Sequence, residues 1–189
     1  MSTDLVAYCS NGNLKKVKKI VNQKGAGVLT YDKNLPLRIA CSSDQIEIVK
    51  YILSFNFIDV TKPYNNAIIR ACQFTDNVEL IKLLVERGAN PYAEQNVCMT
   101  NAVLHNNINV VKYLLTIINP AFLYIDLLTH VVRVQNMEMH HLLLNDNRIL
   151  KEVFKTQYKH ISMSTKYALM LKFNLKTEEE LKKMFNFIS

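Results

Sequence analysis

The sequence contains no tryptophan, and it has only four glycines and four prolines among its 189 residues. Glycine and proline are residues that commonly form turns, so turns should be few and helices should dominate. Hydrophobic residues make up 49% and charged residues 21%, a balance that argues against a disordered chain. We therefore expect one folded domain or one elongated repeat array.

The sequence also lacks an uninterrupted apolar run long enough to cross a bilayer. The longest candidate, from Val110 to Val132, is broken by Lys112, Pro120 and Asp126. A spanning helix needs about 20 mostly apolar residues. This segment is predicted to form two buried helices and a turn, in a soluble protein with no membrane partner.

None of the four cysteines belongs to a CxxC motif; they are Cys9, Cys41, Cys72 and Cys98. No secretory leader is expected before them, because the first residues pass directly into an amphipathic pattern. Reduced thiols inside a cell are the expectation. Cys41 and Cys72 fill the same place in successive copies of the repeat described below, and we interpret both as small buried residues rather than a redox pair.

The formal net charge of +7 reflects many lysines, which are densest at Lys15, Lys16, Lys18 and Lys19. On a helix that begins near Asn13, these lysines spread over the exposed side. The favoured interpretation is a solubilising face on a terminal repeat, and the alternative is a patch for nucleic acid or anionic lipid. Net charge shapes association without fixing its target, so nucleic acid stays an alternative partner.

A repeat of about 31 residues organises the centre of the chain. The small residue at Ala40 recurs at Ala71 and again at Ala102, and the two spacings are equal. A marker in the apolar run that follows recurs at Val49, Ile81 and Val111, with spacings that differ from this period by a single residue position. Two independent markers with nearly the same period predict a repeat protein.

Each repeat is predicted to contain two short helices. The first carries apolar residues around the recurring alanine, which lets the neighbouring helix approach closely. The second has apolar positions at helical spacing, with Glu47 and Lys50 turned outward. Neither helix is long enough to be stable alone in water, so neighbouring repeats must stack to supply the missing burial.

Three motifs resemble those of the ankyrin repeat family. Residues 35–40, Leu-Pro-Leu-Arg-Ile-Ala, are an imperfect copy of the family's T-P-L-H-x-A signature. Residues 88–93, Gly-Ala-Asn-Pro-Tyr-Ala, resemble the family's G-A-D-x-N-A hairpin entry, and residues 48–53 and 110–115 resemble its V-V-K-L-L second helix. The Asn-, Lys- and Ile-rich composition is similar to that of divergent ankyrin proteins of large DNA viruses and protists.

The resemblance implies an all-α ankyrin-repeat solenoid of about five helix-turn-helix units with a C-terminal helical cap. It covers roughly residues 4–145 and is strongest over residues 35–115. The array is predicted over residues 1–145, and a helical cap or degenerate repeat over residues 149–189. The expected units are about 4–30, 31–61, 62–92, 93–120 and 121–148.

Both ends of the array and its hairpins depart from the family pattern. Ala7 takes the place of the recurring alanine in the first unit, whose turn over residues 10–13 then carries one extra residue. Residues 177–180, Thr-Glu-Glu-Glu, are a capping-box start for the last helix. The signature histidine, which usually ties hairpin to helix in this family, is replaced at three places by Arg38, Ile69 and Thr100.

No motif for catalysis or cofactor binding is found. There is no Gly-rich phosphate loop, G-x-S-x-G elbow or H-E-x-x-H motif. His140 and His141 are adjacent, so on a helix they point about 100° apart and do not readily share a metal. Glu138 and His141 have a spacing used in helical di-iron sites, but the second such pair is absent. We predict no enzyme activity, no cofactor and no metal site.

The resemblance places binding residues at the hairpin tips and on the concave face of the first helices. It implies a non-catalytic protein–protein interaction module, an adaptor or host-factor binder, with one protein partner in the cytoplasm (of the host, if the protein is viral). Binding of nucleic acid through the basic surface is one alternative. A ubiquitin-ligase substrate adaptor is another, although residues 150–189 show no convincing F-box pattern. The predicted surface residues are Tyr31, Lys33, Ser43, Lys62, Tyr64, Gln73, Phe74, Tyr92, Glu94, Gln95 and His105.

Overall fold

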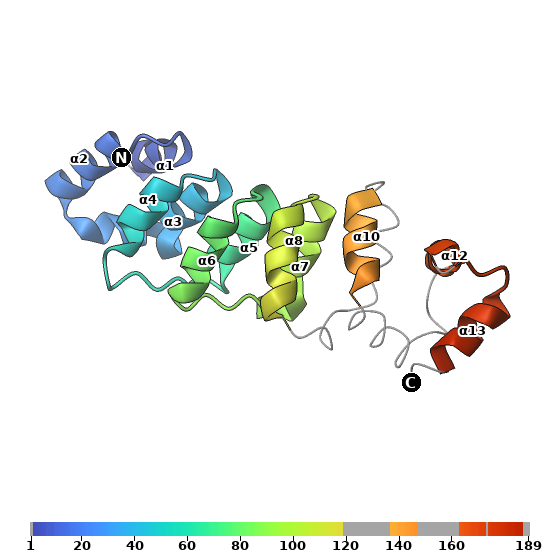
Figure 1. The fold of residues 1–189 in the computed structure, drawn as a ribbon. Coiled ribbons are helices and arrows are strands. Elements are labelled where there is room, and N and C mark those ends of the chain that lie inside the picture. Colours follow the sequence, from blue (N-terminus) through green and yellow to red (C-terminus); the bar gives the residue numbers. More distant parts are fainter. Residues whose placement is uncertain (1, 119–136, 147–162, 173, 187–189) are drawn as a thin grey trace. The chain divides into compact units, whose positions relative to one another are not determined.

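The computed structural model describes residues 2–118, 137–146, 163–172 and 174–186. The chain divides into two compact units, Met1–Leu114 and Leu115–Ser189, and each is described by itself. The described residues form helices and no strand, which confirms the all-α repeat class expected from the sequence (Figure 1). None of the described helices has the length and apolar character that a membrane span requires.

Four helix pairs follow one another in chain order, and the last helix runs just past the end of the first unit (Figure 1). A three-residue connection joins the two helices of every pair. A short 3-10 helix, η1 (Ala26–Thr30), leads into the second pair. The pairs are α1 (Ser2–Ser10) with α2 (Leu14–Lys24), α3 (Tyr31–Ser42) with α4 (Ile46–Leu53), α5 (Asn66–Phe74) with α6 (Val78–Glu86), and α7 (Ala93–Leu104) with α8 (Ile108–Ile117).

The first helices of successive pairs pack closely against one another, much more so than the second helices do. The recurring alanines make this possible, because Ala40, Ala71 and Ala102 are all fully buried and present no bulky side chain to the next helix. Cys41 and Cys72 are fully buried beside them, as small packing residues. The core of the array therefore lies along the row of first helices and the apolar sides of the second helices.

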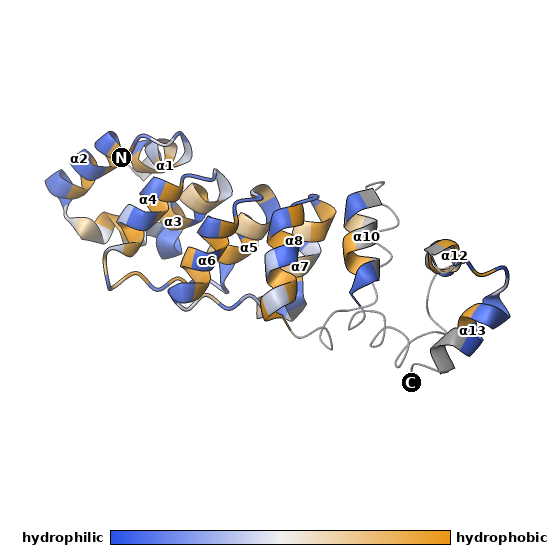
Figure 2. Cartoon of the chain, in the orientation of Figure 1, coloured by the Kyte–Doolittle hydropathy of each residue, from blue (hydrophilic) through white to orange (hydrophobic). Residues whose placement is uncertain are grey.

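The second helices are amphipathic, with hydrophobic and hydrophilic stripes side by side on α4, α6 and α8 (Figure 2). Hydrogen bonds to Glu79 and Glu47 raise the pKa of Lys50. Exposed charges thus add to the apolar contacts between these helices. Polar contacts join the successive second helices: Lys18 Nζ lies 5.3 Å from the Tyr51 ring centroid, Lys50 Nζ 2.9 Å from Glu79 Oε1, and Lys82 Nζ 5.5 Å from the Tyr113 ring centroid.

The predicted alignment of the first helix pair with the later repeats is wrong, as the burial of its residues shows. Ala7 is exposed, whereas Cys9 is fully buried one residue before the end of α1, as Cys41 is one residue before the end of α3. In this register half-buried Tyr8 takes the place of Ala40, and the predicted extra turn residue is absent. The physical reason is that α1 packs against only one neighbouring first helix in the described array, so a small residue is not required there.

Gly12, in the connection between α1 and α2, is a position where a side chain should be costly. Its φ is +77°, a backbone conformation that side-chain-bearing residues rarely adopt, and an added Cβ would also displace the flexible end of the Gln45 side chain. We expect Gly12→Ala to lower the free energy of unfolding by about 1–3 kcal/mol, measured by urea denaturation. Gly27→Ala is the matched control, because nothing lies within 4 Å of its Cβ position, and its effect should stay below about 1 kcal/mol. Equal losses in the two variants would contradict this account.

The described part of the second unit contains three helices: α10 (Met137–Asn145), α12 (Met163–Lys172) and α13 (Glu178–Asn186). The predicted capping box is confirmed, since the Glu180 N–H donates to Thr177 Oγ1 at 3.2 Å and the Thr177 N–H to Glu180 Oε2 at 3.3 Å. The Lys166 ammonium, 2.7 Å from Glu178 Oε1, links α12 to α13. Residues 119–136, with the first helix predicted for the fifth unit, lie outside the described residues. The predicted unit boundaries stay predictions.

Candidate protein-binding surface

Asparagines in left-handed conformation precede the regular first helices of the second, third and fourth pairs. Asn34, Asn65 and Asn96 have φ values of 64°, 55° and 66°. Asparagine adopts this region more readily than most residues, because its short side chain can hydrogen-bond locally. Asn34 Nδ2 donates to the Asp59 carbonyl at 2.8 Å, and Asn65 Oδ1 accepts the Asn90 N–H at 2.8 Å. These two contacts hold each helix start against the hairpin of the next pair.

These asparagines were not predicted to mark the repeat, although they recur with the same period as the alanine of the first helices. Asparagine is abundant throughout the chain, so this recurrence is hard to distinguish from the general composition.

Three tyrosines, Tyr31, Tyr64 and Tyr92, lie at the starts of α3, α5 and α7, and we call them the tip row. Their side chains are 48%, 76% and 39% exposed. A large amphipathic ring with few rotatable bonds provides contact area at a low entropic cost, which is why tyrosine is enriched in binding surfaces. The structure therefore presents one half-exposed or exposed aromatic ring on each of three successive hairpins.

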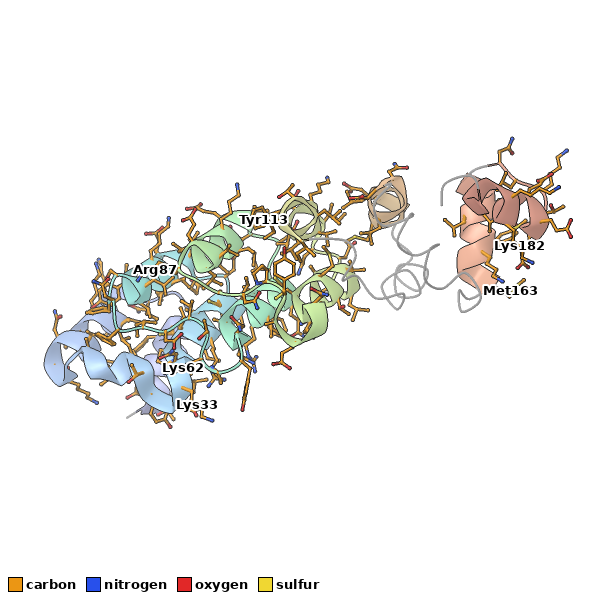
Figure 3. All side chains as sticks on the ribbon, turned by 90° about the horizontal axis from the view of Figure 1, so that it is seen from below. Lys33, Lys62, Arg87, Tyr113, Met163 and Lys182 are labelled. Carbon is orange, nitrogen blue, oxygen red and sulfur yellow. The ribbon has the colours of Figure 1, made fainter. Side chains whose placement is uncertain are left out.

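Positively and negatively charged side chains lie near the tip row, and their charges nearly cancel. Lys62 Nζ lies 3.5 Å from Asp59 Oδ2, and hydrogen bonds from the side chain and backbone of Thr61 lower the pKa of Asp59. Exposed Lys33 has a left-handed backbone, with φ of 54°. Lys33 and Lys62 lie at the same edge of the array in Figure 3. Glu94, also exposed, adds a negative charge at the start of α7.

A second group of predicted residues lies where α5 and α7 end. Together with Leu104, these residues form what we call the turn-side cluster (Gln73, Phe74, Leu104 and His105). The Phe74 and His105 rings lie 6.0 Å apart between centroids, and Gln73 Nε2 lies 3.3 Å from His105 Nε2. Phe74 is 51% exposed and Leu104 41% exposed. Leu104 was not among the predicted residues, because on an amphipathic helix it was indistinguishable from a core residue.

Polar contacts between successive turns hold this side of the array. Asn77 Nδ2 donates to Asp44 Oδ1 at 2.9 Å, and Asn109 Nδ2 donates to Asp76 Oδ2 at 2.8 Å. Each contact joins residues 33 positions apart, one repeat along the chain. The turn-side cluster is therefore carried by turns that are tied to their neighbours.

The predicted residues fall into two groups, at the two ends of the first helices. The tip row, Lys33, Lys62 and Glu94 lie where first helices begin, whereas Ser43 and the turn-side cluster lie where they end. The nine residues of α5 separate the two groups by about 12 Å along the helix axis. Ser43 is half-buried, with its hydroxyl 3.1 Å from that of Ser10. Gln95 is part of α7, and its side chain lies outside the described ones.

Three of the buried thiols have raised pKa values. Burial raises the pKa of the Cys9 thiol to about 12, and it raises the pKa of Cys41 as well. A hydrogen bond with Cys98, together with burial, raises the pKa of Cys72. Protonated thiols are poor nucleophiles and poor metal ligands. Within the described residues, no three His, Cys, Asp or Glu side chains are grouped as a metal site would need.

Residues 5–95 match the family model for ankyrin repeats in three copies. Over these residues the chain carries ankyrin repeats. An ankyrin repeat protein of Acanthamoeba polyphaga mimivirus is 32% identical over 82 residues, which are 43% of this chain and 13% of that relative. The chain thus spans a small part of the length of the curated relative that it matches.

In one of these ankyrin repeats, an arginine replaces the family's histidine and still links the hairpin to the helix. Arg38 stands where the family signature has its histidine. Its guanidinium donates to the Asp32 carbonyl at 2.7 Å and lies 3.4 Å from the Asp32 carboxylate. The sequence departure at Arg38 therefore does not remove the contact that holds the Tyr31 hairpin.

Proposed function

We propose that this ankyrin array binds a protein partner, without catalysis, through the tip row and the turn-side cluster. Ankyrin repeats generally mediate protein–protein interaction. The observation that carries the proposal is the recurrence of exposed tyrosines on three successive hairpins, Tyr31, Tyr64 and Tyr92. Exposed aromatic rings on tied hairpins are suited to act as anchors for a partner.

The partner should contact both ends of the first helices. Half-buried Ile39 and Ile69 lie between the two groups, in the middle of α3 and α5, and offer apolar contact along the way. The charges near the tip row nearly cancel, so aromatic and apolar contacts should dominate the affinity. A protein surface with an apolar centre fits this arrangement better than a highly charged polymer.

We place this binding in the reducing interior of a cell, and in the host cytoplasm if the protein is viral. The four cysteines are free, buried thiols, which suits a reducing compartment. An adaptor or host-factor binder is the role that we propose.

Replacing Phe74 and Tyr92 by alanine tests the surface. We expect Phe74→Ala with Tyr92→Ala to weaken partner binding at least about tenfold, because anchor residues of this kind contribute about 2 kcal/mol each. Partners are first enriched with the wild-type chain from extract and ranked by quantitative mass spectrometry. The affinity of each purified candidate is then measured for the wild type and the double variant.

Tyr167→Ala is the matched control, because this tyrosine of α12 is 62% exposed but lies outside the array of helix pairs. It should leave the affinity within about threefold. Far-UV circular dichroism should be the same for all variants, since the replaced rings are exposed. If every candidate binds the double variant as tightly as the wild type, the proposed surface is wrong.

A further inference from the structure

The second helix of the first pair, α2, carries an unbalanced positive charge. Its eleven residues include five lysines and no acidic residue. Four of the lysines lie within five positions, and we call them the basic face: Lys15, Lys16, Lys18 and Lys19. All four side chains are exposed, whereas Val17 and Val21 on the other side of the helix are buried.

The other second helices with several charges, α4 and α6, contain both acidic and basic residues. In α4, Lys50 pairs with Glu47 at 3.2 Å and with Glu79 of α6 at 2.9 Å. The last helix, α13, likewise combines three glutamates with lysines. Solubility of an exposed helix therefore does not require charge of one sign in this chain, and a solubilising role alone leaves the composition of α2 unexplained.

The arrangement of charge on α2 is unfavourable to the helix itself. Lys15 and Lys19 are four residues apart, and Lys16 and Lys19 three apart, so like charges are neighbours on its surface. Lys15 and Lys16 also lie in the first turn, where the helix dipole favours negative charge. A bound anionic group would relieve both effects at once.

Within the described part of the chain, Lys15, Lys16 and Lys19 have no ion-pair or ring partner. Lys18 alone of the four has one, the Tyr51 ring of α4 at 5.3 Å. A shallow, open hollow adjoins the start of the helix and is lined by residues 11–14 with Lys15 and Lys18. The basic face is thus accessible and electrostatically uncompensated.

From these observations we propose that the basic face of α2 binds an acidic segment of a polypeptide. This contact is separate from the tip row and the turn-side cluster, and it does not depend on the function proposed for them. The partner segment would place glutamate or aspartate carboxylates against the lysine ammonium groups, with the open hollow receiving the end nearest Lys15.

The surroundings of α2 favour a short acidic segment over longer or larger polyanions. The helix is about 16 Å long, and the exposed carboxylates of Glu47 and Glu79 lie on the next two second helices, α4 and α6. A nucleic-acid duplex that extended across the array would approach these negative groups. The basic face also has no arginine or aromatic residue for base readout or stacking. The apolar side of α2 is buried at Val17 and Val21, so it has little to insert into a membrane.

The test compares two variants of the full chain that lose the same charge. The first is Lys15→Gln, Lys16→Gln and Lys19→Gln, which spares Lys18 because of its contact with Tyr51. The control removes three exposed cations elsewhere: Arg87→Gln, Lys176→Gln and Lys183→Gln. Each variant has a net charge of 7 − 3 = +4.

Binding of a labelled, short polyglutamate peptide is measured by fluorescence anisotropy between about 50 and 200 mM salt. We expect the α2 variant to bind at least about tenfold more weakly at low salt and with a flatter salt dependence, and the control to stay within about threefold of the wild type. Thermal unfolding of both variants should match the wild type, or rise slightly for the α2 variant as like charges are removed.

Two further probes decide the class of partner: a DNA duplex with the same number of charges, and vesicles containing phosphatidylserine. If the duplex and the vesicles both bind more weakly than the peptide, and depend less on the α2 lysines, the proposal is supported. Tighter binding of the duplex or of the vesicles that is lost with the α2 lysines overturns it, since the face would then recognise phosphates. Equal losses of peptide binding in the two triple variants also overturn it, because net charge alone would explain the result.

Discussion

Leu84→Ala should lower the free energy of unfolding of the array by about 2–5 kcal/mol. Leu84 is fully buried in α6, within the third helix pair. Its removal takes away apolar contacts and leaves a cavity that the surrounding helices fill only partly. The third pair stacks between α3 and α7, so the defect lies at the centre of the described array rather than at an end.

Urea unfolding followed by circular dichroism measures the effect. The control is Leu104→Ala, which removes the same atoms from a side chain that is 41% exposed, and it should cost less than about 1 kcal/mol. Because each pair is stabilised mainly by its neighbours, weakening the third pair should also broaden the unfolding transition. Similar losses from both variants would show that Leu84 is not part of a packed core.

The period and the helix pairs could be predicted from sequence because burial repeats with them. Ala40, Ala71 and Ala102 recur because each occupies a tight contact between first helices, where a larger side chain would not fit. The apolar positions of the second helices recur for a similar reason. Tertiary packing requires these residues at these positions, so their spacing in the sequence predicts the fold.

The local geometry of the predicted surface residues could not be derived from the sequence in the same way. The contact between the Phe74 and His105 rings depends on how α5 and α7 end, one repeat apart in the sequence. The exposure of Tyr64 depends on a left-handed backbone at Tyr64 and Asn65, with φ values of 47° and 55°. Non-glycine residues seldom adopt this conformation, so residue type alone gives little indication of it.

The error at the first pair has the same origin. Ala7 was matched to the recurring alanine by residue type, but the position equivalent to Ala40 is occupied by half-buried Tyr8. The alanines of α3 and α5 lie in helices that pack between two first helices, where a small residue is required. Among the described first helices, α1 packs against α3 alone, so a small residue is not required at this position and the alanine pattern is absent there.

The same difference in packing makes Ala71→Leu the second large expected effect. Ala71 is fully buried in α5, which packs closely against both α3 and α7. Adding three carbons there forces the neighbouring first helices apart, because a close-packed core has no empty volume for them. We expect the free energy of unfolding to fall by about 3 kcal/mol, at the upper end of the range for overpacked cores.

Ala7→Leu separates this steric cause from any effect of leucine itself on helix stability. Alanine and leucine differ little in helix propensity, and Ala7 is exposed on α1, so this variant should change the free energy of unfolding by less than about 0.5 kcal/mol. Ala71→Gly is a further check, because it costs about 1 kcal/mol in helix propensity without separating the helices. If Ala71→Leu proved no worse than Ala71→Gly, the first helices would be less closely packed than the burial of Ala40, Ala71 and Ala102 indicates. The regular recurrence of alanine in successive repeats would then need a cause other than steric fit.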